Sequence, residues 1–147
     1  MRPAIKLALE SAHNADRWIT KESQFQECVA KLLDSLGLFW CHVPNGGQRD
    51  KRTAVALKRQ GVKPGVPDVM IFEPWEGETT KYGWTNVEQY TGCAIELKYG
   101  KNKPTFNQME WLDQLSKNGW YTNIAYSMAD VIAILGKCGY LEQLEAK

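Results

Sequence analysis

The sequence predicts an α/β fold with a mixed central sheet flanked by helices. Short apolar runs typical of strands alternate along the chain with segments whose apolar residues recur at helical spacing. No repeat or linker divides residues 1–147, so we expect a single domain of ordinary length. Hydrophobic residues make up 44% of the chain and charged residues 24%, a composition that excludes a disordered protein.

The first elements are predicted from the spacing of apolar residues. Residues 1–20 hold apolar side chains among charged ones and are predicted to form a short helix or an arm. Residues 21–36 form a predicted helix, because their apolar side chains recur at intervals of three and four residues, and Gly37 ends it. Residues 38–43 form a predicted strand, since this apolar run stops at the turn that begins with Pro44.

The middle of the chain combines a short helix with two strands. A helical pattern over residues 53–60 is followed by a glycine that ends it. The stiff turn at residues 63–67 leads into a predicted strand over 68–72, and a further strand is predicted over 93–98. Between these strands, residues 74–92 show no clear periodicity, which predicts an insertion or a long hairpin.

The last elements are predicted to be a helix, a strand and a helix. Residues 105–118 form the first helix, and Gln108 can make a capping box with the threonine three residues before it. A strand is predicted over residues 120–126 and a helix over 127–135, and the tail from Tyr140 is also predicted to be helical.

Membrane-spanning and disulfide-stabilised proteins are disfavoured. The longest apolar runs, residues 36–41 and 131–135, are far shorter than the roughly 20 residues of a membrane helix. The first residues also lack the apolar core of a signal peptide. The four cysteines lie far apart without metal-binding spacing, so we expect free thiols in a reducing cytoplasm.

The net charge of +1 conceals two segments of opposite charge. Residues 49–63 hold six basic residues and one acidic residue, whereas residues 73–88 hold four acidic residues and one lysine. Clustered positive charge binds nucleic-acid phosphates, although a solvated helix surface would have the same composition. The predicted nucleic-acid contacts are Asn45, in an Asn-Gly-Gly turn that could equally be an ordinary one, and Arg49, Lys51, Arg52, Lys58, Arg59 and Lys63. Trp75 and Trp84 could face a partner or stack on a base.

Charged side chains interrupt two consecutive predicted strands. Side chains alternate between the two faces of a strand, so Glu96 and Lys98 project from the same face. Asp68 begins the preceding strand, and pairing of the two strands would bring its carboxylate near that of Glu96. Converging carboxylates bind a divalent cation, and oxygen ligands favour Mg²⁺ or Mn²⁺ over zinc. The alternative is an ion pair between Glu96 and Lys98 on an edge strand.

These residues carry a resemblance to a known family. Pro67-Asp68 followed by Glu96-Leu97-Lys98 resembles the signature of the PD-(D/E)-x-K nucleases, which have the restriction-endonuclease-like fold. The run at residues 61–68, together with Gln108, is more specifically similar to the VRR-NUC family over about residues 21–135. That family includes small stand-alone proteins of bacteria and phages. Residues 74–92 match no pattern of the family.

The resemblance implies a role for each site residue. Asp68, Glu96 and the main-chain carbonyl of Leu97 would hold Mg²⁺ or Mn²⁺, and Lys98 would orient or activate the attacking water. Gln108 would face the active site, unless its side chain serves only as a helix cap.

The family also implies a further acidic ligand from the first helix of the resembling region. At 100° per residue, Glu22 lies on the apolar face of the helix that contains Phe25, whereas Glu27 points to solvent. Glu22 is therefore the predicted acid. The alternative is that Glu22 is merely favoured in the first turn by the helix dipole.

The function implied by the resemblance is a metal-dependent endonuclease that acts on branched DNA such as four-way (Holliday) junctions. Symmetric cutting of a junction requires two sites and hence a homodimer. The implied location is the cytoplasm of a bacterial cell or a phage-infected host. The alternatives are a non-catalytic nucleic-acid-binding module with the same fold, and a restriction-type or RNA-directed nuclease.

Overall fold

The computed structural model describes residues 2–44 and 50–142. Along the chain its elements are α1 (Pro3–Ala15), α2 (Glu22–Ser35), β1 (Trp40–His42), α3 (Lys51–Arg59), β2 (Val69–Ile71), β3 (Trp75–Lys81), β4 (Trp84–Tyr90), β5 (Cys93–Leu97), α4 (Phe106–Lys117), β6 (Tyr121–Ala125) and α5 (Met128–Lys137). Residues 140–142 are also helical, and the rest of the tail predicted to be helical lies outside the described residues. The predicted segment 1–20 contains a helix, α1, and the segment 74–92 contains the β3–β4 hairpin.

The central sheet has the strand order β1-β2-β5-β6. β2 pairs antiparallel with both β1 and β5, whereas β6 pairs parallel with β5. The parallel pair is joined through α4, because parallel neighbours need a long crossover connection. All five residues of β5 are buried, as expected for a central strand covered on both faces. The predicted α/β fold with a mixed sheet is confirmed.

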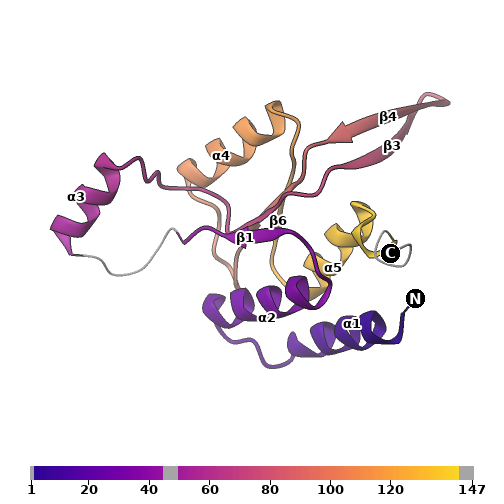
Figure 1. Cartoon of the computed structure of the whole chain (residues 1–147), viewed down its shortest axis with the longest axis horizontal. Helices are drawn as coiled ribbons and strands as arrows, with labels where there is room; N and C mark the ends of the chain where they lie inside the picture. Colours follow the sequence, from indigo (N-terminus) through magenta and orange to yellow (C-terminus); the bar gives the residue numbers. More distant parts are fainter. Residues whose placement is uncertain (1, 45–49, 143–147) are drawn as a thin grey trace.

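Helices cover the two faces of this sheet (Figure 1). α1, α2 and α5 pack against one another below the sheet in this view, and α4 lies on the other side against β5 and β6. The apolar side chains of the lower layer form one continuous core from Ile5 to Tyr140. Asp16, just after α1, connects the first and last helices of this layer. Its carboxylate accepts hydrogen bonds from the main-chain N–H groups of Met128 (2.7 Å) and Ala129 (3.1 Å) at the start of α5.

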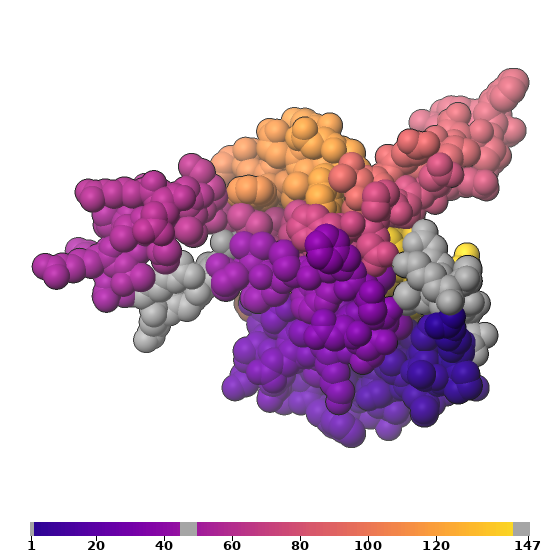
Figure 2. All heavy atoms as spheres, in the orientation of Figure 1, coloured from indigo at the N-terminus to yellow at the C-terminus, as the bar shows by residue number. Residues whose placement is uncertain are grey.

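Two arms project from this body at opposite ends (Figures 1 and 2). One arm is α3, of which no residue is buried. The other is the β3–β4 hairpin, whose residues are exposed along most of its length. Trp75 is buried at the base of the hairpin, where it stacks on Tyr90 with ring centroids 4.3 Å apart, so it is not available to stack on a base. Trp84, by contrast, is exposed near the tip.

All four cysteines lie within the described residues and are free thiols. Cys93 and Cys138 are buried, whereas Cys41 is exposed although it belongs to an apolar segment. Among the described helices, none combines the length and the apolar character needed to cross a membrane.

Candidate active site

Two carboxylates meet where the pairing of β2 with β5 ends. The last residue pair at this end is Val69 with Ile95, so the next position places Asp68 opposite Glu96. Residues opposite each other in antiparallel strands share a face, and their side chains are close neighbours. The ladder stops there, and the main-chain N–H of Leu97 donates to Oδ2 of Asp68 at 2.9 Å. The end of the ladder therefore orients the Asp68 carboxylate toward β5.

Glu96 is buried in an unfavourable position for a charged group. Only 2% of the residue is exposed, and its Oε2 has no hydrogen-bond partner among the described residues. Burial, and then the neighbouring Asp68 carboxylate, raise the pKa of Glu96 to about 8. Lys98 opposes this effect, since its Nζ lies 3.7 Å from Oε1 of Glu96. The ion pair of the alternative interpretation is therefore present, but β5 is a central strand, so its placement on an edge strand is wrong.

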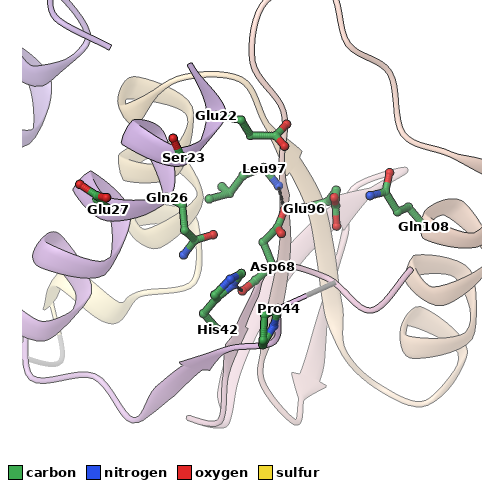
Figure 3. A pocket seen from close by; sticks show the side chains of 10 residues that line it. All are labelled: Glu22, Ser23, Gln26, Glu27, His42, Pro44, Asp68, Glu96, Leu97 and Gln108. Atoms are coloured by element: carbon green, nitrogen blue, oxygen red, sulfur yellow. Dashed lines mark hydrogen bonds between the residues drawn. The ribbon is translucent and has the colours of Figure 1, made fainter. Parts of the chain in front are cut away.

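Both carboxylates open into a pocket of about 480 Å³ (Figure 3). Side chains from α2, from the end of β1 and from the start of α4 complete its wall. The lining residues are Glu22, Ser23, Gln26, Glu27, His42, Pro44, Asp68, Glu96, Leu97 and Gln108. The pocket therefore brings together four of the five side chains predicted to be catalytic, and the fifth, Lys98, contacts Glu96.

Glu22 and Glu27 both line the pocket but point in different directions. Figure 3 shows the Glu22 carboxylate turned toward Leu97 and Glu96, whereas the Glu27 carboxylate points away from the other labelled side chains. The charge of Glu22 also contributes to the raised pKa of Glu96. Glu22 is exposed, so its side chain can move toward the carboxylate pair or away from it without a large change in its contact with solvent.

The Gln108 side chain caps a helix and also faces the pocket, as the two predicted alternatives describe. Its Oε1 accepts the Thr105 main-chain N–H at 2.8 Å and the Thr105 hydroxyl accepts the Gln108 N–H at 3.2 Å, which completes a capping box at the start of α4. The side chain also lines the pocket, and Figure 3 shows its amide facing Glu96. The turn before β2 fixes this end of α4, because a Cβ on Gly65 would lie 2.6 Å from the main chain of Asn107.

Half of the ten lining residues were not among the predicted site residues, and two of these, His42 and Gln26, have side chains suited to a role in the site. His42 Nδ1 donates to the main-chain oxygen of Asp68 at 2.7 Å, and so it holds the backbone that carries the carboxylate. Its signal in the sequence is weak, because a histidine in an apolar strand usually has a structural role. Gln26 lies one helical turn after Glu22, and its Nε2 is buried without a partner among the described residues. The spacing of four residues from a predicted site acid could have identified Gln26.

The donor set fits a hard divalent cation. Asp68 and Glu96 supply carboxylate oxygens, and the Oε2 of Glu96 lacks a partner among the described residues, so a bound cation would stabilise the ionised form of this buried group. Within the described residues, no three histidine, cysteine or acidic side chains come close enough together to form a metal site. Glu22 therefore stands apart from the pair, and the main-chain carbonyl of Leu97 remains the other predicted ligand.

Most of the predicted nucleic-acid contacts lie on α3 or just after it. Lys51, Arg52, Lys58 and Arg59 are exposed, as is Lys63 in the following turn. At 100° per residue the four α3 cations fall within one third of the helix circumference, with Val55 at the centre of that face. Asn45 and Arg49 lie outside the described residues.

Comparison with known proteins identifies the family. The VRR-NUC domain model matches residues 20–129, about three quarters of the chain. This chain belongs to the VRR-NUC family. The family is of the nuclease type, and the matched region contains every pocket-lining residue from Glu22 to Gln108.

A solved structure supports the fold of this VRR-NUC chain. It is described as a "VRR_NUC domain protein" and superimposes with a TM-score of 0.52 at 21% sequence identity. The alignment covers 94% of this chain and 86% of the other, so the shared fold extends over most of both chains. None of the curated proteins matches the chain.

Proposed function

We propose that this VRR-NUC protein is a divalent-metal-dependent endonuclease that hydrolyses phosphodiester bonds of DNA. The observation that carries the proposal is the pairing of buried Glu96 with half-buried Asp68, beside Lys98, at the floor of an open pocket. Two neighbouring carboxylates, one of them buried, destabilise a fold unless a cation joins them, and a pocket of this size admits a phosphate. A structural ion pair would not need an open pocket.

Asp68, Glu96 and the Leu97 carbonyl would hold Mg²⁺ or Mn²⁺, with Glu22 as a further acid at the rim. When bound, the cation would polarise the scissile phosphate and lower the pKa of an attacking water. Asp68 is already oriented for this role by the Leu97 N–H and, through its backbone, by His42.

The remaining groups act on the water and the phosphate. Lys98 is nearly buried beside Glu96, so its ammonium can orient the water and stabilise the negative charge that develops on the phosphate. The amide of Gln108 faces the same space, and its capping bond to Thr105 fixes its position. It can therefore hold the water or a phosphate oxygen without a large loss of side-chain entropy.

The substrate of the proposed enzyme is branched DNA, with four-way junctions as the leading example. The basic face of α3 would contact phosphates, which supply affinity without reading sequence. Symmetric cleavage of a junction needs two active sites, so we propose a homodimer with twofold symmetry. The cytoplasm of a bacterial or phage-infected cell is the proposed location, which suits the free thiols.

A cleavage panel tests the proposal. The purified chain is incubated with linear duplex, flap, splayed-arm and four-way DNA of matched sequence, and with the same strands as RNA, each in Mg²⁺, Mn²⁺, Ca²⁺ or EDTA. Binding and cleavage are both measured. We expect cleavage in Mg²⁺ or Mn²⁺, none in EDTA, and a preference for the branched substrates. The matched variants are Glu96→Gln, which should be inactive, and Glu27→Gln, which should retain activity.

The outcomes separate the candidate functions. Binding of DNA in every metal without cleavage would show a non-catalytic module, whereas cleavage of RNA alone would show an RNA-directed nuclease. Cleavage at a fixed sequence in linear duplex would show a restriction-type enzyme. Each of these results would overturn the proposal.

A further inference from the structure

The tip of the β3–β4 hairpin holds an aromatic residue in an unusual backbone conformation. Lys81 pairs with Trp84, so only Tyr82 and Gly83 form the turn, and both have positive φ values of 55° and 81°. Such two-residue turns favour asparagine, aspartate or glycine at these positions, because a larger side chain is strained there. Within the described residues, Tyr82 is the only one other than glycine with a positive φ. The strain indicates that the ring itself is useful at the tip.

The aromatic rings at the tip are presented to solvent. Tyr82 is 88% exposed and Trp84 is 76% exposed, and Figure 2 shows the hairpin projecting well beyond the body of the protein. The Nζ of Lys81 lies 5.4 Å from the centroid of the Tyr82 ring. Lys81 and Trp84 are directly opposite each other and therefore share a face of the hairpin. One cation and two exposed rings thus form a small group at the end of the arm.

The charge pattern of the hairpin indicates what the tip can contact. The stem carries Glu76, Glu78 and Glu88, whereas Lys81 is the one charged residue between Glu78 and Glu88. A duplex that lay along the stem would be repelled by these carboxylates. The charge at the tip is positive, so the bases of a nucleic acid could meet the tip without that repulsion. Base faces stack well on aromatic rings, and they do so without regard to sequence. Exposed bases are therefore the ligand that this tip suits.

The tip also lies far from the catalytic pocket. Asp68 precedes β2 and Leu97 ends β5, while β3 and β4 connect to the other ends of these strands. Each hairpin strand has seven residues and spans roughly 23 Å. A contact at the tip therefore adds to binding only when the nucleic acid reaches both ends of the sheet. Branched DNA does so more readily than linear duplex, because its arms diverge and its bases are less well stacked at the branch.

We propose that Tyr82 and Trp84 form a base-stacking tip that engages unpaired or unstacked bases of branched DNA. This inference rests on the proposed function, since it names the feature by which the nuclease would select its substrate. The tip supplies a contact that a linear duplex at the pocket does not make.

The double variant Tyr82→Gly and Trp84→Thr tests the proposal in the full chain. Glycine relieves the strained φ and threonine suits an exposed strand, so the hairpin should stay folded. Binding is measured in Ca²⁺ to a four-way junction and to linear duplex, with 2-aminopurine placed beside the branch. We expect the dissociation constant for the junction to rise roughly 5- to 150-fold for each base that loses its stacking partner. Quenching of 2-aminopurine seen with the parent protein should be lost, and duplex affinity should not change.

The matched control is Val87→Thr, because Val87 is 58% exposed on the stem of the same hairpin. This variant should bind both DNAs as the parent does. Unchanged junction affinity in the double variant, or an equal loss for junction and duplex, would overturn the base-stacking role. Dissociation of a parental dimer in the double variant would overturn it in favour of contact with a second copy. If the parent cleaves no DNA, the proposed function fails; if parent and variant select junctions alike, only this inference fails.

Discussion

Replacing Glu96 by glutamine should stabilise the metal-free protein while abolishing metal binding. The carboxylate is buried beside Asp68, and its pKa of about 8 lies above the usual value of 4.5. Because the pKa is higher in the folded protein than in the unfolded chain, folding takes up a proton near neutral pH. This group therefore favours folding most at pH values below 4.5, and its contribution is lost as the pH rises toward 8. Above pH 4.5 the folded protein must therefore either take up a proton at Glu96 or bury a charged carboxylate, and both cost free energy. Glutamine keeps the size of the side chain and does not ionise, so the variant avoids this penalty.

The magnitude follows from the shift. At pH 7 the penalty in the parent protein is roughly 3 kcal/mol, because the free energy changes by about 1.4 kcal/mol for each pH unit between 4.5 and the ambient pH. At pH 5 the same relation gives less than about 1 kcal/mol. The free energy of unfolding of Glu96→Gln should therefore exceed that of the parent by a few kcal/mol at pH 7, and by much less at pH 5.

Urea unfolding in EDTA at both pH values measures this difference, with Glu27→Gln as the exposed control. Saturating Mg²⁺ should then stabilise the parent but not Glu96→Gln, since a ligand at 100 times its dissociation constant adds about 2.7 kcal/mol. Two results would refute the reasoning: a variant no more stable than the parent in EDTA at pH 7, or a difference that does not depend on pH.

Three further variants test the site and the basic arm. Lys98→Ala should reduce the single-turnover cleavage rate by about 10²–10⁴ while Ca²⁺-supported DNA binding persists, because the lysine acts on the water and phosphate; near-parental cleavage would remove it from the mechanism. Glu22→Gln should cost much more activity than Glu27→Gln in the same assay, and the reverse order would mean that the wrong acid has been chosen. The Arg52→Ala, Arg59→Ala double variant should flatten the salt dependence of junction affinity by about 1–2 units of log–log slope; an unchanged slope would make α3 a solvated surface.

The elements that build the site were predictable because their apolar residues face one core. α2 was expected at residues 21–36 and occupies Glu22–Ser35, since its buried side chains follow a helical period. β5 was expected at 93–98 and occupies Cys93–Leu97, since a short run of mostly apolar residues is typical of a strand covered on both faces. The proximity of Asp68 and Glu96 followed from the alternation of side chains and the pairing of consecutive strands.

The two arms, α3 and the β3–β4 hairpin, were less predictable, because few of their side chains are buried. The β3–β4 hairpin has exposed residues on both faces, so no alternation of apolar and polar residues marks its strands. Its turn, Tyr82-Gly83, also departs from the asparagine- or aspartate-glycine signal of such hairpins. The helical pattern of α3 was readable, but its separation from the core was not, since the pattern does not show that none of its residues is buried.

The candidate site depends on a local failure of sheet pairing. Pro67 precedes Asp68 and has no N–H to donate, so the β2–β5 ladder cannot continue past the two carboxylates. The Leu97 N–H, which a longer ladder would have paired with β2, is instead available to bind the Asp68 side chain. β5 nevertheless continues to Leu97 because β6 pairs with it on the other side. One strand partner thus stops while the other persists, and that difference both opens the pocket and keeps Glu96 buried at its floor.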